Sequence, residues 1–199
     1  MKRRLTIATM ALCITALFGA GCLDEKTIEI VITGETSADF AQNETSASWA
    51  EGTILDMGAE IRDILESNGY GSEDLKSAHV TSVSYGVLSF AQAHDWQITG
   101  AITVSYDGAT ETIVNYASQS VQDALGRKIP APLEPAGVAL INRALQDFLD
   151  GVDPLLALTI ENGSTAPVPS VEDPMVFDWR AWLAVQVIVV ESVEVPDPF

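Results

Sequence analysis

The sequence predicts an α+β domain in which two helices pack on a mostly antiparallel sheet of about six strands. Two segments repeat apolar residues at the spacing of a helix with one buried face. Other segments alternate apolar and polar residues, as half-buried strands do. The predicted order is strand, helix, three strands, helix and two strands, which fits helices on one face of a sheet. A β-sandwich with peripheral helices is the alternative architecture.

The first part of the domain is predicted to hold one strand and one helix. Residues 27–33 are rich in β-branched side chains and form the expected first strand. Residues 35–47 are polar and are expected to form a loop. Ser48 and Glu51 have the spacing of a capping box, and apolar residues follow at helical intervals, so we predict a helix over residues 48–68.

Two long strands are predicted in the middle of the chain, over residues 78–91 and 96–107. The second strand has one apolar and one polar face, so the apolar face is expected to be buried and the polar face to be exposed to solvent. The apolar face consists of Trp96, Ile98, Gly100, Ile102, Val104 and Tyr106.

An Asp-Gly pair at the end of the second strand predicts a hairpin, and the side-chain pattern can decide its loop length. A two-residue loop would pair Gly100 with Asn115. A three-residue loop pairs Gly100 with Tyr116 and keeps one continuous apolar face. We therefore predict a loop over residues 107–109 and a strand over residues 110–118.

The last third of the chain is predicted to contain a helical turn over residues 120–126 and a helix from Pro135 to Gly151. Strands over residues 155–161 and 175–195 follow, with a Pro-containing loop between them. The final strand has apolar residues on both faces, which predicts a central strand covered on both sides or one shifted by a bulge. These residues are Phe177, Trp179, Leu183, Val185, Val187 and Val189 on one face and Trp182, Ile188 and Val190 on the other.

The first 22 residues predict export. A basic stretch over residues 1–4 precedes an apolar run over residues 5–18, which is too short to span a membrane and is typical of a signal peptide. Residues 20–22, Ala-Gly-Cys, resemble the lipobox of bacterial lipoproteins, in which the cysteine is diacylated and becomes the new N-terminus. The family usually has Leu where this chain has Gly19, so ordinary cleavage after Gly21 with release of a soluble protein is the alternative.

The resemblance implies a lipid anchor at Cys22. The chain would then consist of a signal peptide over residues 1–21, a lipidated tether over residues 22–26 and a single domain over residues 27–199. Leu23 follows the cysteine, so the Asp signal that retains lipoproteins in the inner membrane of enteric bacteria is missing. The expected location is the extracytoplasmic side of a bacterial cell envelope, with the outer membrane favoured in a Gram-negative host.

The chain is strongly acidic, with 10 basic against 28 acidic residues and a formal net charge of −18. Removal of residues 1–21 takes away three basic and no acidic residues, which leaves 7 against 28 and a charge of −21. No nucleic-acid partner is therefore expected, and attachment to anionic membranes must come from acyl chains. The charge fits solubility, salty surroundings or a basic partner, and calcium capture by Asp150, Asp153, Glu172 and Asp173 is a further hypothesis.

Candidate catalytic residues are few. The lipidated chain would have no free thiol, because Cys13 lies in the removed segment and Cys22 carries the lipid. His79 and His94 are the two histidines, and they are expected to lie too far apart to share a metal. His79 is expected near Asp107, which could orient it as a base, but no nucleophile motif accompanies the pair. No catalytic, cofactor-binding or metal-binding residue is predicted.

These observations predict a membrane-anchored, non-enzymatic lipoprotein that acts as a structural or protein-binding module. One alternative is a binder of an apolar small molecule or lipid, with a cavity lined by Trp96, Ile102, Leu145 and Trp179. The other is a hydrolase that uses carboxylates. An apolar pocket would favour the binder, convergent carboxylates the hydrolase, and a solid core with an exposed sheet edge the protein-binding module.

Overall fold

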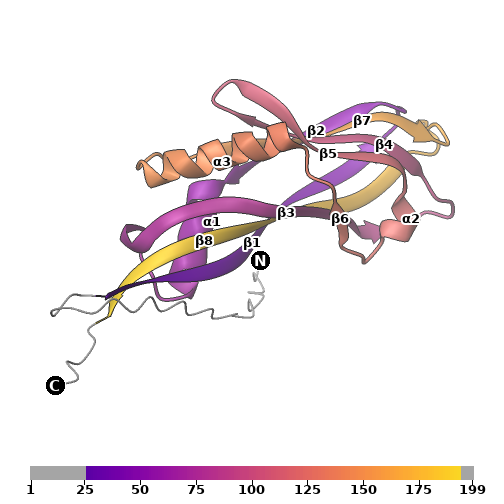
Figure 1. Ribbon diagram of the computed structural model, residues 1–199. Coiled ribbons are helices and arrows are strands. Elements are labelled where there is room, and N and C mark those ends of the chain that lie inside the picture. The colour runs from indigo at the N-terminus through magenta and orange to yellow at the C-terminus, as the bar shows by residue number, and fades with distance from the viewer. Residues whose placement is uncertain (1–25, 194–199) are drawn as a thin grey trace, which may run out of the picture.

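The computed structural model describes residues 26–193, and over this range the chain is mostly β (Figure 1). Sheet A contains, in spatial order, β1 (Lys26–Glu44), β8 (Met175–Val193), β3 (Leu75–Phe90) and β6 (Ile129–Ala131). Sheet B contains β2 (Trp49–Asp56), β7 (Leu155–Ala166), β4 (Gln97–Tyr106) and β5 (Ala109–Ser120). The connections hold α1 (Met57–Ser67), the 3-10 turn η1 (Ser72–Asp74), α2 (Val121–Ala124) and α3 (Pro135–Leu149).

The strand pairing follows one rule. Strand β1 pairs with β8, β2 with β7, β3 with β6 and β4 with β5, always antiparallel. The chain is thus one long antiparallel ribbon that turns back at the β4–β5 hairpin, and successive pairs of the ribbon lie alternately in sheet A and sheet B. This is the topology of a jelly roll. The prediction of an α+β domain with a single sheet is therefore wrong.

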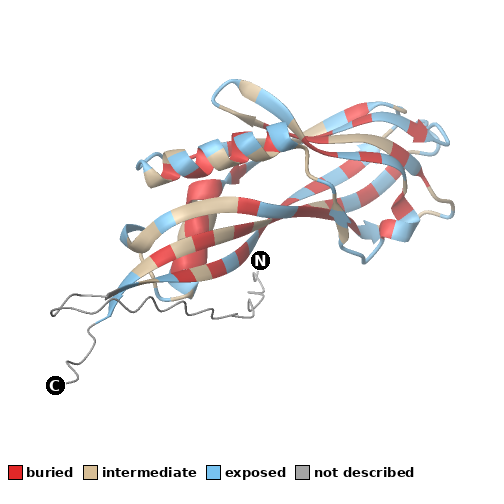
Figure 2. Ribbon diagram, viewed as in Figure 1, coloured by how far each residue is buried: buried red, intermediate tan, exposed pale blue. Residues whose placement is uncertain are grey.

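The two sheets and two of the helices enclose one core (Figure 2). At one end the inner faces of the sheets meet through aromatic side chains. Trp49 of β2 packs edge-on against Phe177 of β8 at 6.5 Å between ring centres, and Tyr116 of β5 packs against Trp179 of β8 at 5.5 Å. At the other end, α3 contacts β3 of sheet A and β4 and β5 of sheet B, while α1 contacts β1, β7 and α3. These helices are part of the core and are not peripheral to it.

The first strand is much longer than predicted. β1 continues without interruption from Lys26 to Glu44, so the loop predicted over residues 35–47 is wrong for most of its length. The second half of the strand does not show a clear alternation of apolar and polar residues in the sequence, because two of its inward residues are polar. The buried inward residues of this half are Thr36, Ala38, Phe40 and Gln42.

The first helix begins later than predicted. Residues 49–56 form strand β2, so the helix predicted over residues 48–68 is wrong in its first half. Helix α1 begins at Met57, and the carboxylate of Asp56 caps it by accepting a hydrogen bond from the backbone N–H of Ala59 at 2.9 Å. The capping-box spacing at Ser48 is therefore a chance match within a strand connection.

The central hairpin has the predicted register at Gly100, which lies opposite Tyr116. Its loop is nevertheless shorter than predicted, because only residues 107–108 separate the strands, with left-handed φ angles of 49° and 76°. An extra residue in β5, Ile113, forms a bulge that restores the apolar register. The carbonyl of Ile113 accepts a hydrogen bond from the backbone N–H of Glu134 at 2.8 Å, so the bulge also fixes the chain just before α3.

The last helix and the last strand agree with the prediction in position. Helix α3 begins at Pro135, and β8 is a central strand of sheet A, between β1 and β3. The inward residues of β8 are buried, whereas Trp182, Ile188 and Val190 on its outer face are half-buried. The prediction of full cover on both sides is therefore wrong, and the outer face of sheet A presents apolar side chains. The buried residues of α3 are Gly137, Leu140, Ile141, Ala144, Leu145 and Phe148.

Candidate functional site

The free edge of β1 is the longest unpaired strand edge in the described part of the chain. All 19 residues of β1 pair with β8 in one register without a bulge, and no strand within residues 26–193 pairs with its other edge. The edge is roughly 60 Å long at about 3.3 Å per residue. Short length, prolines and bulges commonly protect edge strands from further pairing, and β1 has none of these features.

Three acidic residues on the outer face of β1 form ion pairs with cations from β3, from β8 and from the residue just before β6. These acids are separated by six and four residues, and an even spacing places side chains on the same face of a strand. We call the three pairs the charge ladder. Its members are Glu29 with Lys76 of β3, Glu35 with Lys128 next to β6, and Asp39 with Arg180 of β8.

The charge ladder also covers an aromatic ring. Lys128 Nζ lies 5.3 Å and Arg180 Cζ lies 5.9 Å from the ring centre of Trp182, which gives two cation–π contacts. Arg180 binds Asp39 through two nitrogens, with Nη2 donating to Oδ2 at 2.6 Å, and this hydrogen bonding raises the pKa of Arg180. The acids on the outer face of β1 are thus all paired, in a chain whose net charge is −18.

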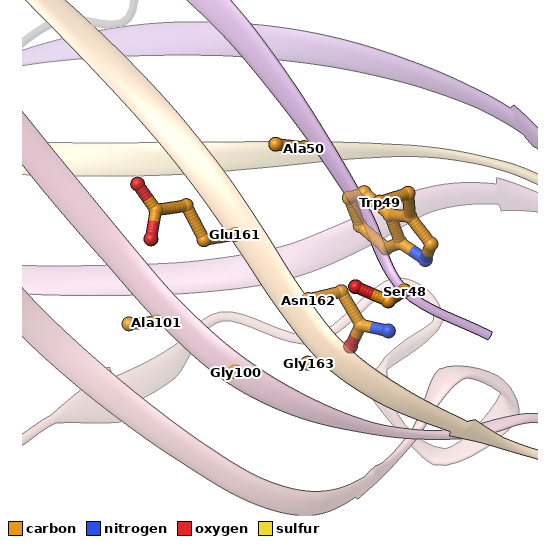
Figure 3. Close-up of a pocket in the computed structure, with 8 residues that line it drawn as sticks. All are labelled: Ser48, Trp49, Ala50, Gly100, Ala101, Glu161, Asn162 and Gly163. Carbon is orange, nitrogen blue, oxygen red and sulfur yellow. The ribbon is translucent and has the colours of Figure 1, made fainter. Parts of the chain in front are cut away.

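A shallow hollow of about 580 Å³ lies on sheet B and is open to solvent (Figure 3). Glu161 is the one titratable side chain among the residues that line it, and its Oε1 lies 3.4 Å from the hydroxyl of Thr103. A lone carboxylate does not provide a general acid–base pair, so the hollow gives no support to the hydrolase hypothesis. The lining residues are Ser48, Trp49, Ala50, Gly100, Ala101, Glu161, Asn162 and Gly163.

Close strand packing at Gly100 holds this part of sheet B together. A Cβ atom there would lie 2.0 Å from the carbonyl oxygen of Glu161 and 2.7 Å from the hydroxyl oxygen of Tyr116. The hydroxyl of Tyr116 donates to the same carbonyl at 3.2 Å, and burial raises the pKa of Tyr116. The contact links β5 to β7 across β4, which explains why the register places an aromatic residue over a glycine.

The two histidines lie in separate places. His79 is in β3 of sheet A, whereas its expected neighbour Asp107 is in the hairpin of sheet B and pairs with Arg143. The predicted His79–Asp107 pair is therefore wrong. His94 Nε2 lies 3.4 Å from Asp173 Oδ2, near the loop that precedes β8.

The acidic residues considered for calcium do not converge. Asp153 pairs with Arg62 of α1, and Asp173 lies beside His94. Within residues 26–193, no three His, Cys, Asp or Glu side chains lie close enough together to hold a metal ion. The predicted lipidation site, Cys22, lies outside the described residues.

The residues considered for an apolar cavity belong to the core. Trp96, Ile102, Leu145 and Trp179 are each at most 1% exposed and are members of the same core cluster. None of them lines the hollow on sheet B. Among the helices of residues 26–193, none has the length and apolar character needed to cross a membrane.

Sequence reasoning missed the charge ladder because it ended the first strand at Thr33. The even spacing of the three acids was visible in the sequence, and it places them on one face as soon as the strand is known to continue. Their cationic partners have no local signal, because they reach β1 only through the pairing of strands that are distant in sequence.

No family model matches the chain, and no curated protein matches it. Among solved structures, the chain is similar to the decameric capsid protein of BFDV, at 10% identity over 81% of this chain and 99% of that chain, with a TM-score of 0.33. It is also similar to a chain of the infectious bursal disease virus structure, at 13% identity over 89% of this chain and 42% of that chain, with a TM-score of 0.29. A chain of the turnip yellow mosaic virus structure is similar at 9% identity over 96% of this chain and 93% of that chain, with a TM-score of 0.28. At these scores the likenesses carry no functional argument, and the jelly-roll assignment rests on the strand order.

Proposed function

We propose that the protein is a lipid-anchored lipoprotein on the extracytoplasmic side of a bacterial envelope, and that it binds a partner protein through the free edge of β1. The observation that carries this proposal is the edge itself, with 19 residues in one register and no bulge or proline. A partner strand can pair with such an edge, because unpaired backbone N–H and C=O groups supply the affinity.

The proposed anchor is close to this edge in the sequence. Cys22 precedes Lys26, the first residue of β1, by four positions. A chain of that length reaches at most about 15 Å. Lys26 lies opposite Val193, the last residue of β8, so β1 begins and β8 ends at the same end of sheet A. In this proposal the edge runs from the anchor to the far end of the sheet, where a neighbouring envelope protein can reach it.

The proposed role is non-enzymatic, and the two histidines provide a test of it. Both histidines lie outside the hollow on sheet B, and the hollow holds a single carboxylate. A chain that carries His79→Ala and His94→Ala is therefore expected to complement a deletion strain. Loss of complementation at unchanged folding and abundance would contradict the non-enzymatic role.

The anchor is tested by mass spectrometry of the membrane fraction, which is expected to find a diacylated N-terminal Cys22. Cys22→Ser is expected to release or mislocalise the protein. A soluble mature chain with an unmodified Cys22 thiol would overturn the lipoprotein assignment, because the alternative cleavage after Gly21 produces that species.

The edge is tested with a photo-crosslinking residue at Thr33 of β1 and, as the matched control, at Thr159 in the central strand β7 of sheet B. In intact cells the Thr33 variant is expected to crosslink to one partner and the Thr159 variant is not. With that partner purified, hydrogen exchange is expected to slow at alternate amides of β1, since successive N–H groups of a strand point to opposite sides. Equal crosslinking at both positions, or slowed exchange confined to other elements, would contradict strand addition.

A further inference from the structure

In two ion pairs of the charge ladder, only one oxygen of the carboxylate binds the internal cation. Lys76 binds one oxygen of Glu29, and Lys128 binds one oxygen of Glu35. The other oxygen of each carboxylate accepts no hydrogen bond from residues 26–193. The two acidic side chains are 52% and 43% exposed, so a molecule that arrives at the edge can reach them.

The geometry of strand addition sets where a partner's side chains would lie. An added strand runs about 4.8 Å from β1, and directly opposed residues bring their Cβ atoms to about 5 Å. Glu29 and Glu35 are six residues apart on one face, roughly 20 Å along the strand. The two residues opposite them are therefore also six apart and on one face of the added strand.

Charge decides which residues fit these two positions. A Lys or Arg opposite each carboxylate can bind its free oxygen, whereas an acid there would face a like charge at close range. The whole chain adds to the selection, since 28 acidic against 10 basic residues attract a basic segment and repel a second copy of the chain.

The inner face of the edge selects for apolar residues on the other side of the added strand. Ile30 and Ile32 are buried at the edge of sheet A, and Ile64 of α1 packs directly over the Cα of Gly34. Side chains that an added strand turns inward would extend this apolar surface.

We propose, on the basis of the strand addition proposed above, that the partner supplies an extended amphipathic segment with two basic residues six positions apart on one face and apolar residues on the other. Glu29 and Glu35 bind the two cations, and the backbone of β1 binds the backbone of the segment.

The test uses three labelled peptides of equal length and a soluble mature chain with Cys22→Ser. The first peptide alternates apolar and polar residues and has two lysines six positions apart, on one face. The second has the same composition, but its lysines are five positions apart and therefore lie on opposite faces. The third has glutamates in place of the two lysines of the first. Fluorescence anisotropy is expected to show about tenfold tighter binding of the first peptide than of the second at low salt, and least binding of the third. Hydrogen exchange is expected to show that the first peptide protects β1.

Matched variants assign the preference to the two carboxylates. Glu29→Gln with Glu35→Gln is expected to reduce the preference for the first peptide over the second and over the third, whereas Glu161→Gln on sheet B is expected to leave both preferences unchanged. Equal binding of all three peptides at β1 would overturn the charge selection and leave strand addition in place. Dimerisation through β1 in preference to peptide binding would overturn the inference in favour of a second copy. Failure of the Thr33 crosslinking experiment would instead overturn the proposed function itself.

Discussion

Sheet A and sheet B bury their inner faces in one core but present different outer faces. The central strands of sheet A, β8 and β3, contribute cations to the charge ladder and carry the half-buried Trp182. The central strands of sheet B, β7 and β4, contain a single charged residue, Glu161. The two sheets also differ at their edges, because the outer strands of sheet B have 8 and 12 residues and β1 has 19.

This difference shows where the chain places its scarce positive charge. Within residues 26–193, five ion pairs involve Lys or Arg, and three of them form the charge ladder on sheet A. The ladder pairs each acid on the outer face of β1 with a cation and so neutralises these acids. Among the described residues, sheet B has no edge as long as that of β1 and no comparable ladder, so the placement of cations and the proposed binding edge coincide.

The largest expected effect comes from removing the contact that joins both sheets. Leu145 of α3 is fully buried, and α3 contacts β3 of sheet A and β4 and β5 of sheet B. Leu145→Ala is expected to lower the free energy of unfolding by about 2 to 5 kcal/mol, because it leaves a cavity where the helix meets the sheets. Gln97→Ala, at an exposed position in β4, is the control and is expected to change the melting temperature little. Equal effects of the two substitutions would mean that α3 does not join the sheets.

The next effect is specific to the packing of sheet B. Gly100→Ala places a Cβ atom 2.0 Å from the carbonyl oxygen of Glu161, so the strands must separate. The expected cost is about 1 to 3 kcal/mol in the free energy of unfolding, measured by denaturant titration. Gly163→Ala in the same sheet is the control, because the nearest atom to its Cβ, the carbonyl oxygen of Thr99, is 3.7 Å away. A cost at Gly100 no larger than that at Gly163 would show that the close strand approach is not required.

The sequence predicted the parts of the fold in which short-range pattern and packing agree. The hairpin register at Gly100, the start of α3 at Pro135 and the position of β8 all follow from residues within one or two elements. The bulge at Ile113 shows the limit of this reasoning, because a two-residue turn and an extra residue in β5 produce the same apolar register as a three-residue loop.

The fold class was predicted wrongly because it depends on contacts between residues far apart in the sequence. Pairing of β1 with β8 joins residues 26–44 to residues 175–193, and no local pattern specifies it. The polar inward residues Thr36 and Gln42 also hid the second half of β1, and with it the candidate site. The proposed edge was therefore not visible from the sequence, although the acidic excess that selects its basic partner was.

A pH-dependent effect distinguishes how the two sheets hold α3. Asn142 accepts a hydrogen bond from the backbone N–H of Val80 in sheet A at 2.9 Å, and this neutral contact does not titrate. On sheet B, the hydroxyl of Tyr106 donates to Asp147 at 2.7 Å, and this hydrogen bond raises the pKa of Tyr106 to about 12.

The phenol of Tyr106 is thus kept neutral in the folded state, and its contribution to stability is complete below the unfolded pKa of about 10 and is lost as pH rises toward 12. The wild-type chain is expected to be more stable than Tyr106→Phe near neutral pH, and the difference in unfolding free energy is expected to shrink between about pH 9 and pH 12. Denaturant titrations of both chains measure this difference. A constant difference across that range would show that the hydrogen bond does not hold the helix.

The smallest expected effect concerns the charge ladder, and here the sign of the change distinguishes the two sheets. Glu35→Gln removes an exposed ion pair with Lys128 and is expected to lower the free energy of unfolding by at most about 1 kcal/mol at low salt. Glu161→Gln removes a carboxylate that has no cationic partner among residues 26–193, so it is expected to leave stability unchanged or raise it slightly by reducing the repulsion within an acidic chain. Both effects are expected to fade in about 1 M salt, where the screening length falls to about 3 Å. If Glu35→Gln stabilises the protein as much as Glu161→Gln does, the ion pairs of the charge ladder do not stabilise sheet A. The difference in charge between the two outer faces then has no effect on the free energy of unfolding.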